Sequence, residues 1–423
     1  MVVDTTIAGI TVGDAHPVRI MGAINLSRES FYKGSVTEQG NVVPVAEQMV
    51  AEGADFIDVG ARSTWPLADK ITKEEERKRL IPALEQLTGN VDVPISVDTQ
   101  CADLASDALE MGARIINDVS GLTADPGMAE VVHEYVCPVV VMASDRVPGD
   151  VIGMDAVMQS LDRIIKKAED TGIAPEQIII DPAIGKWVPE KVPIYDFETI
   201  DQMERLKVFD KPVLAAISRK SLIGEVLDKP PTDRLMGSIA ATAIAVYKGA
   251  HIIRTHDVAG TVDAIRVAEA IKGRNITAGK PDHPIEALDN HFAKALDNYS
   301  VEVLDITSAK DAPGYFNRIG ATGTGGRVMK DKTVHRVLKI NNVTTTEALI
   351  IKQEALSRGC DAALPRDAVS HETDSVDLIL MGTELQLKRL AAKLECQARD
   401  LPVIAGLVQT ALQRFNDTIY RYG

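Results

Sequence analysis

Two adjacent cations and three isolated polar residues stand at the ends of apolar stretches of this chain. Arg219 and Lys220 follow directly after an apolar run in the sequence VLAAISRKS. Asp98 ends the run PISVD, Asn117 lies in IIND and Asp181 ends IIID, and none has an obvious local partner. Carboxylates and an amide suit a heterocycle rich in N–H donors and ring acceptors, since a hydrogen bond to a charged group contributes about 1.5–3 kcal/mol. These residue types indicate that the chain binds a polar heterocycle.

Other polar residues at run ends are suited to an anion. Arg254 and His256 follow the run HII, and a helix is expected to begin near Ser221, beside Lys220. The exposed N–H groups of a helix start favour negative charge, as do the cations. Helix capping explains equally well three further polar residues at run ends, Thr99, Asp118 and Asp257.

Eight short apolar runs, each followed by a segment of helical period, are the elements that position these residues. The predicted strands are residues 18–24, 55–59, 94–97, 114–116, 139–142, 178–180, 213–217 and 251–253. The predicted helices are 42–53, 73–88, 100–112, 127–135, 155–172, 196–207, 232–248 and 258–272. This alternation predicts a (β/α)8 TIM barrel, and a doubly wound sheet is the alternative. In a barrel the polar residues after the strands form one cluster at the carboxyl face.

Composition excludes several function classes. The net charge of −15 provides no electrostatic footprint for nucleic acid. No apolar run reaches the roughly 18 residues of a membrane span, and the first residues lack the order of a signal peptide, so no membrane association and a cytoplasmic location are expected. The widely spaced cysteines are expected to be reduced thiols, without a disulfide frame or a zinc site: Cys101, Cys137, Cys360 and Cys396.

The chain beyond the eighth unit predicts a second, smaller domain. The sequence GRNITAGKPDHP at 273–284 is typical of a linker. Short strands are expected in VEVLDI, VHRVLKI, AALPRDAV and VDLILMG, with helices near 285–298, 344–358, 384–397 and 402–415. We predict a barrel at 1–274, a linker and helix at 275–298, and a small α+β domain at 299–423. The G-x-G-G pattern at 320–328 precedes no long helix directly, which disfavours a nucleotide loop.

The run-end motifs resemble a known family. IMGAINLSRESF, FIDVGARSTWP, ISVDT, IINDVSGL, IIIDPAIGK, AISRKSLIG and IIRTHDV are similar, in order and spacing, to the strand-end motifs of dihydropteroate synthases. The similarity spans about residues 15–273, and SRKS with RTHD is specific to the synthases among pterin-binding barrels. The resemblance implies a transferase that joins 6-hydroxymethyl-7,8-dihydropterin diphosphate to p-aminobenzoate, with Mg2+ present and diphosphate released, in folate or methanopterin biosynthesis.

The resemblance also implies a role for individual residues. Catalysis is expected to depend on Lys220, Asp98 and Arg254. The small-molecule substrates are the pterin and the arylamine, and a homodimer is expected, with the C-terminal domain in dimer contacts or as a scaffold. The pterin is expected to contact Asp98, Asn117, Asp181, Lys220 and Met142; the diphosphate Asn25, Arg254 and His256, with Asn25 near the metal; and the arylamine Thr64, Pro66 and Ser221. Arg219 is expected to turn outward into a salt bridge.

Several positions depart from the family pattern. The first loop has Arg28 and Glu29 where the family has proline and aspartate, and the second has Arg62 and Trp65 where it has glutamate and arginine. Ala143 replaces a common histidine. Arg28 or Arg62 restores the lost positive charge, or the acceptor is a bulkier phosphorylated arylamine such as ribofuranosylaminobenzene phosphate. A methylpterin:corrinoid methyltransferase and a non-catalytic pterin-binding protein are the alternative functions, although the first leaves SRKS and RTHD without a role.

Overall fold

The chain forms two compact units, residues 1–300 and 301–423, in a computed structural model. The structure describes residues 3–27, 36–62, 71–272, 306, 309, 312–319, 323–366, 368 and 373–418. The boundaries predicted near 274 and 298 fall outside these ranges and stay predictions, as do the helix at 285–298 and the strand VEVLDI, of which only residue 306 is described.

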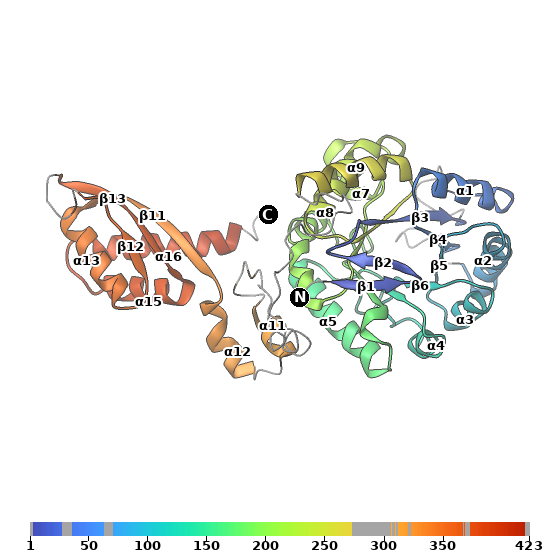
Figure 1. Ribbon diagram of the computed structural model, residues 1–423, viewed down its shortest axis with the longest axis horizontal. Helices are drawn as coiled ribbons and strands as arrows, with labels where there is room; N and C mark the ends of the chain where they lie inside the picture. The colour runs from blue at the N-terminus through green and yellow to red at the C-terminus, as the bar shows by residue number, and fades with distance from the viewer. Residues whose placement is uncertain are drawn as a thin grey trace, which may run out of the picture. The chain divides into compact units, whose positions relative to one another are not determined.

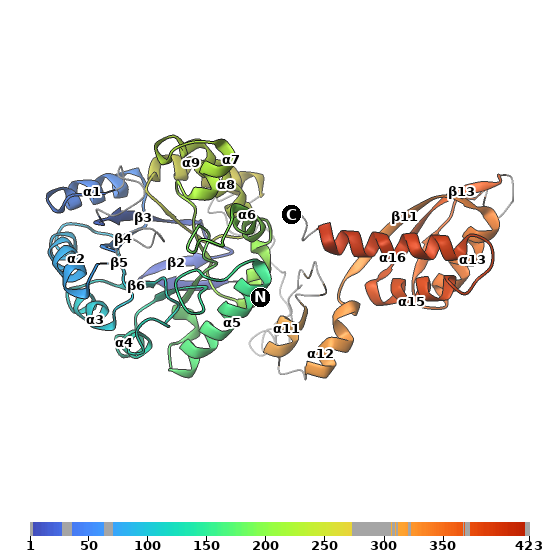
Figure 2. The same ribbon diagram turned by 180° about the vertical axis from the view of Figure 1, so that it is seen from behind.

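The first unit is a parallel barrel of eight strands surrounded by helices (Figure 1, Figure 2). Its strands are rich in valine and isoleucine and are buried on both faces, as expected when helices cover a parallel sheet. They are β3 (Arg19–Asn25), β4 (Phe56–Gly60), β5 (Ile95–Asp98), β6 (Ile115–Asp118), β7 (Val139–Met142), β8 (Ile178–Asp181), β9 (Leu214–Ala216) and β10 (Ile252–Thr255).

The strand order shows that the sheet closes on itself. The order is β8-β7-β6-β5-β4-β3-β10-β9, and every pair is parallel. A parallel bridge between Ile180 and Val213 joins the two ends of this order, and the amide of Ile180 donates to the carbonyl of Pro212 at 2.9 Å. The predicted (β/α)8 barrel is therefore confirmed.

The helices of the barrel agree with the predicted segments, with one difference. The helix expected near Ser221 is present, and the segment predicted as one helix at 196–207 is an α-helix followed by a 3-10 helix at Met203–Phe209. The helices are α1 (Val42–Glu52), α2 (Lys73–Thr88), α3 (Ala102–Glu110), α4 (Met128–Glu134), α5 (Met154–Asp170), α6 (Pro193–Asp201), α7 (Ser221–Leu227), α8 (Leu235–Tyr247) and α9 (Val258–Ile271).

An N-terminal hairpin closes one end of the barrel. The antiparallel strands β1 (Asp4–Ile7) and β2 (Ile10–Gly13) are joined by Ala8 and Gly9, both at positive φ, as a two-residue hairpin turn requires. Ile7 and Val12 of the hairpin are fully buried and pack with the barrel residues Met21, Phe56, Ile115, Val140, Ile179, Leu214 and Ile252. This end is filled with apolar side chains, so a ligand site must lie at the other.

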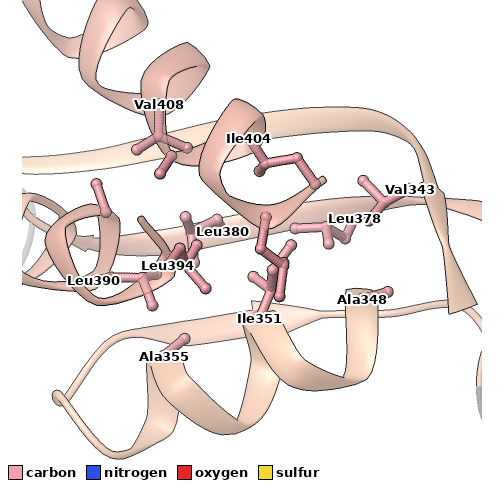
Figure 3. Close-up of a cluster of buried hydrophobic side chains, with 14 of the residues drawn as sticks. Val343, Ala348, Ile351, Ala355, Leu378, Leu380, Leu390, Leu394, Ile404 and Val408 are labelled. Carbon is pink, nitrogen blue, oxygen red and sulfur yellow. The ribbon is translucent and has the colours of Figure 1, made fainter. Parts of the chain in front are cut away.

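The second unit contains a three-stranded antiparallel sheet of order β11-β13-β12. Its helices pack on the sheet around one apolar cluster, in which Ile351, Leu380, Leu390 and Ile404 meet (Figure 3). This arrangement confirms the predicted α+β class. The elements are α11 (Ala312–Arg318), α12 (Gly323–Met329), β11 (His335–Thr344), α13 (Thr345–Leu356), β12 (Asp361–Ala363), β13 (Ser375–Thr383), α15 (Glu384–Leu394) and α16 (Leu401–Thr418).

Two sequence predictions in this unit differ in detail. The strand predicted in AALPRDAV is only three residues long, because Pro365 lacks the N–H that a strand needs to continue. The G-x-G-G pattern lies within the short helix α12. No helix among the described residues is long and apolar enough to cross a membrane.

Candidate active site

A cavity opens where the parallel strands end. Its wall contains nearly all of the described residues that are assigned to the pterin, the diphosphate and the arylamine, which are Asn25, Asp98, Asn117, Asp181, Lys220, Ser221, Arg254 and His256. Gly60, Arg62, Gly185, Lys186 and Trp187 complete this part of the wall.

These residues converge because side chains alternate along a strand. Asn117 stands two positions after Ile115, Asp181 two after Ile179, and Arg254 two after Ile252. Each isoleucine belongs to the apolar cluster beneath the hairpin. The residue two positions later points into the same barrel interior, one layer closer to the carboxyl ends, which places distant residues in one cavity.

Asp58 on β4 is a fully buried carboxylate next to the cavity, and the sequence analysis assigned no role to it. Its Oδ2 accepts from Nε of Arg254 at 2.6 Å and from Nδ2 of Asn117 at 3.3 Å. Its Oδ1 accepts from Oγ of Ser96 at 2.6 Å. One carboxylate on β4 thus connects the residue predicted for the heterocycle with the residue predicted for the anion.

Asp98 shares Arg254 with Asp58. Nη2 of Arg254 donates to Oδ2 of Asp98 at 3.2 Å. Burial raises the pKa of Asp98 to about 7; Arg254 opposes the shift and Asp58 adds to it. The Asp98 carboxyl therefore changes its protonation near neutral pH. Arg254 has five N–H donors, of which these carboxylates occupy two, so donors remain for an anion in the cavity.

Asp181 and Lys220 both line the cavity, and each influences the charge of the other. Nζ of Lys220 donates to the carbonyl of Ile184 at 2.5 Å and lies 5.1 Å from the ring centroid of Trp187, within cation–π range. Burial lowers the pKa of Lys220 to about 8, an effect that Asp181 opposes. Burial also raises the pKa of Asp181, against the influence of Lys220. Gly185 has a φ of +123°, which favours glycine, and a Cβ there would lie 2.9 Å from Cδ of Lys220 and displace this lysine.

His256 directly follows β10 and Asn25 ends the neighbouring strand β3, and both line the cavity. Nδ1 of His256 lies 3.0 Å from the carbonyl of Ala23 and must carry a proton to donate to it. Burial and the charge of Arg254 lower the pKa of His256 to about 4, so the imidazole is neutral at pH 7. Oδ1 of Asn25 accepts from the amide of Ser27 at 2.9 Å.

Arg219 forms the predicted salt bridge but does not turn outward. Nε and Nη2 donate to the two oxygens of Asp257 at 2.8 and 2.7 Å, and Nη1 donates to the carbonyls of Pro231 and Thr232. The side chain is buried among these partners, and the backbone of Arg219 is left-handed (φ +54°). Of the two cations in SRKS, only Lys220 lines the cavity.

Arg62 is held against the cavity wall by a carboxylate from α2. Nε and Nη2 donate to Oε2 of Glu76 at 2.9 and 2.7 Å, and Oγ1 of Thr99 donates to Oε1 at 2.8 Å. Glu76 is 1% exposed. Arg62 therefore places a cation at the cavity, but its charge is largely balanced by Glu76. Arg28, Thr64 and Pro66 lie outside the described residues.

Some residues do not follow the predictions. Met142 is fully buried at the end of β7 and does not line the cavity, so its contact with the pterin stays a prediction. The oxygens of Asp118 accept from the amides of Ser120 and Leu122 in a turn, and no helix begins there. Asp257 stands at the start of α9 but makes no side-chain capping bond. Thr99 is not the N-cap of α3: its Oγ1 donates to Glu76 and accepts from the amide of Cys101, the residue before the helix.

The fold and this cavity define a class of barrel enzymes that bind pterins. Residues 21–256 match the family described as pterin binding enzyme. The chain is 36% identical over 270 residues to the dihydropteroate synthase of Escherichia coli K12, which covers 62% of this chain and 94% of that protein.

Solved structures support the same classification. A dihydropteroate synthase of Xanthomonas albilineans with 4-aminobenzoic acid aligns with a TM-score of 0.57 and 34% identity, over 64% of this chain and 99% of that one. The same enzyme with 7,8-dihydropteroate aligns with a TM-score of 0.55 and 33% identity, over 64% and 98%. The chain belongs to the dihydropteroate synthase family of pterin-binding transferases, as its strand-end motifs predict.

Proposed function

We propose that this protein transfers the pterin methylene of 6-hydroxymethyl-7,8-dihydropterin diphosphate to the amino group of p-aminobenzoate. The observation that carries the proposal is the arrangement of the cavity, with Asp98, Asn117 and Asp181 on one side and Arg254 bridging toward the anion end. The related Xanthomonas enzyme binds both 4-aminobenzoic acid and 7,8-dihydropteroate, the expected acceptor and product.

The pterin ring is assigned to the carboxylates and the amide. Asp98 and Asp181 accept from the ring's N–H and amino groups, and Asn117 both donates and accepts. Lys220 lies alongside the ring and balances the charge of Asp181. Met142 is assigned a supporting position behind the ring. Hydrogen bonds to ionised groups in a buried site are stronger than neutral ones, which favours this ring over less polar heterocycles.

The diphosphate is assigned to Arg254, His256 and Asn25. Arg254 donates through the N–H groups that Asp58 and Asp98 leave available. Since Nδ1 of His256 donates to Ala23, Nε2 can donate to an oxygen of the diphosphate only after protonation. The negative charge of the bound diphosphate is therefore expected to raise the pKa of His256.

Mg2+ fits this site only as an ion carried by the diphosphate. The described residues contain no group of three His, Cys, Asp or Glu side chains suited to a metal. Mg2+ commonly keeps several waters and takes few protein ligands beside substrate phosphates, and the amide oxygen of Asn25 is suited to such a contact. When bound, the ion would neutralise part of the charge of the leaving group.

The arylamine is assigned to Ser221, Thr64 and Pro66. Ser221 begins α7 directly after Lys220, so the acceptor lies next to the pterin. Arg62 on the cavity wall supplies a cation for the acceptor's carboxylate. The Arg62–Glu76 pair adds little net positive charge, which supports p-aminobenzoate rather than a phosphorylated arylamine as the acceptor.

The reaction follows from these positions. The C–O bond to the diphosphate breaks, the amine nitrogen forms a C–N bond with the pterin methylene, and the nitrogen loses one proton to solvent. Negative charge grows at the diphosphate, near Arg254, while positive charge grows at the methylene, near Asp98. The site thus stabilises the transition state more than the ground state. An arylamine is neutral and nucleophilic near pH 7, so alignment of the two substrates takes the place of a strong base.

A homodimer is part of the proposal. Four side chains spaced along one face of α8 are exposed, namely Met236, Ala240, Ile244 and Tyr247. An exposed apolar stripe of this kind marks a protein interface. Light scattering is expected to give a dimer for the native chain and a monomer for Ile244→Glu. A native monomer would contradict this part. A cytoplasmic location stays a prediction.

One experiment tests the proposed activity. The protein is incubated with the dihydropterin diphosphate and Mg2+, with p-aminobenzoate, with a phosphorylated arylamine or with no acceptor, and the released diphosphate is measured. We expect release with p-aminobenzoate, in equal amount to dihydropteroate, and little without an acceptor. Release only with the phosphorylated acceptor would change the assigned substrate. No release with any acceptor would refute the transferase assignment.

A further inference from the structure

A buried ion pair lies behind the cavity, outside the residues that line it. Nζ of Lys191 is 3.5 Å from Oδ1 of Asp196, and each residue is 2% exposed. Lys191 lies two residues before α6, in the loop that follows β8, and Asp196 lies in the first turn of α6. No role assigned above involves this pair.

Both members of the pair hold the backbone of that loop. Nζ of Lys191 donates to the carbonyl of Ala183 at 2.5 Å, and Oδ1 of Asp196 accepts from the amide of Gly185 at 2.9 Å. The residue between these two tethers is Ile184, whose carbonyl accepts from Lys220. The pair therefore fixes the peptide group that carries the Lys220 acceptor, through the amide of Gly185, and the preceding peptide group, through the carbonyl of Ala183.

The same short segment also fixes Asp181. Its Oδ1 accepts from the amide of Ala183 at 2.7 Å. The backbone conformation here is unfavourable without support from its surroundings, because Ala183 (φ +63°) and Gly185 (φ +123°) both have positive φ. A non-glycine residue in the left-handed region persists only when its surroundings hold it there. Lys191 and Asp196 bond Ala183 and Gly185 and, with Asp181, hold this backbone in place.

Stability alone does not account for this pair. Burial lowers the pKa of Lys191 and raises that of Asp196, so the low-polarity environment opposes both charges. Apolar residues of similar volume often replace a buried ion pair without loss of stability. A pair whose members both bond one functional loop is better explained by the geometry that it imposes.

We propose that Lys191 and Asp196 are positioning residues for the pterin: they hold backbone groups 183–185 so that Asp181 and Lys220 face the ring. This inference rests on the proposed function, because it takes the pterin as the ligand of these two residues. It requires that the pair influence pterin affinity without contacting the pterin and without influencing the arylamine.

The test is the double variant Lys191→Met/Asp196→Leu, which removes both tethers and leaves no unpaired buried charge. Calorimetry with 6-hydroxymethyl-7,8-dihydropterin, which lacks the diphosphate, is expected to give a Kd at least tenfold higher than that of the native protein. The KM for the pterin diphosphate is expected to rise similarly, with the KM for p-aminobenzoate within twofold. Pterin Kd and KM within twofold of the native values would overturn the inference.

Two further variants separate positioning from folding. Lys191→Met/Asp196→Asn keeps an acceptor for the amide of Gly185, and its pterin Kd is expected to lie between those of the native protein and the leucine variant. If the leucine variant does not fold, the asparagine variant decides, and a native Kd there overturns the inference. The control Lys211→Met/Glu169→Leu removes a pair between a buried lysine and an exposed glutamate, with 3.3 Å between Nζ and Oε1, and neither residue lines the cavity. This variant is expected to leave the Kd unchanged.

The native protein distinguishes failure of this inference from failure of the proposed function. Native turnover with an unchanged pterin Kd in the variants would overturn the positioning role alone. Native pterin binding without turnover would refute the transferase reaction and leave the positioning role to be judged by the Kd values. A native protein that binds no pterin would overturn both.

Discussion

Nε of Arg254 and Oδ2 of Asp58 are 2.6 Å apart, although 196 positions separate the two residues in the sequence. Asp58 is fully buried, and the same oxygen accepts from the amide of Asn117. The cation assigned to the diphosphate and the amide assigned to the pterin therefore depend on one carboxylate. Asp58 touches neither substrate in this assignment, yet it sets the orientation of groups that touch both.

The variant Asp58→Asn is expected to release Arg254 and Asn117 from the orientation that Asp58 imposes on them. The asparagine keeps the shape of Asp58 but removes the charge that holds Arg254, and loss of one partner of a buried ion pair costs about 3–5 kcal/mol. The KM for the pterin diphosphate should rise at least tenfold and the melting temperature should fall. Ser96→Ala, which removes one neutral hydrogen bond worth about 1 kcal/mol, is the control and should remain near-native in KM. Native kinetics in Asp58→Asn would contradict this role.

Asp98→Asn and Lys220→Ala should each remove most turnover. Asp98 accepts from the ring, and Lys220 balances Asp181 beside it, so each loss removes a charged hydrogen bond or contact. We expect kcat/KM to fall by about 100-fold, which corresponds to about 2.7 kcal/mol. Circular dichroism of both purified variants should match that of the native protein. Near-native rates from both would exclude the assigned roles.

The pH profile of kcat/KM should be narrow. Asp98 must be ionised to accept from the pterin, and its pKa of about 7 means that this state is lost as the pH falls. Lys220 must be charged, and its pKa of about 8 means that this state is lost as the pH rises. We therefore expect kcat/KM to be greatest between about pH 7 and 8. Lys220→Arg stays charged and should lose the alkaline decline; a flat native profile from pH 5.5 to 9 would contradict the account.

Arg62 should influence the binding of the acceptor and leave the binding of the pterin unchanged. The paired variant Arg62→Gln/Glu76→Gln replaces two charges with neutral groups that can still hydrogen-bond, so the fold should persist. The KM for p-aminobenzoate is expected to rise about tenfold, because an ion pair with the acceptor's carboxylate is lost, which corresponds to about 1.4 kcal/mol. The single variant Arg62→Ala should be less stable, since Glu76 remains buried without its cation. An unchanged KM would remove Arg62 from the acceptor site.

Much of this site was predictable from the sequence because it lies at the ends of strands. The period of two along each strand and the parallel order bring Asp98, Asn117, Asp181 and Arg254 to one face, and both features are local patterns that a sequence displays. The sequence at 5–12 also contains a pattern typical of a β-hairpin, a two-residue turn between alternating apolar residues. The β1–β2 strands that it forms are only four residues long.

The partners of these residues were not predictable in the same way. Glu76 reaches Arg62 from the first turn of α2, where its spacing is that of an ordinary acidic helix start. The pairing of Lys191 with Asp196 depends on how the β8–α6 loop folds back, and the partners of Asp58 come from three different strands. Such contacts are long-range and depend on side-chain direction, which a local pattern does not specify.

The central claim is that one pterin ring is held by residues from different strands at the carboxyl end of the barrel. A crystal structure with bound 6-hydroxymethyl-7,8-dihydropterin tests it most directly. We predict that N–H groups of the ring lie within hydrogen-bond distance of the carboxylates of Asp98 and Asp181, with Asn117 on the same ring edge. A ring bound outside this cavity, or within it but contacting neither carboxylate, would contradict the account.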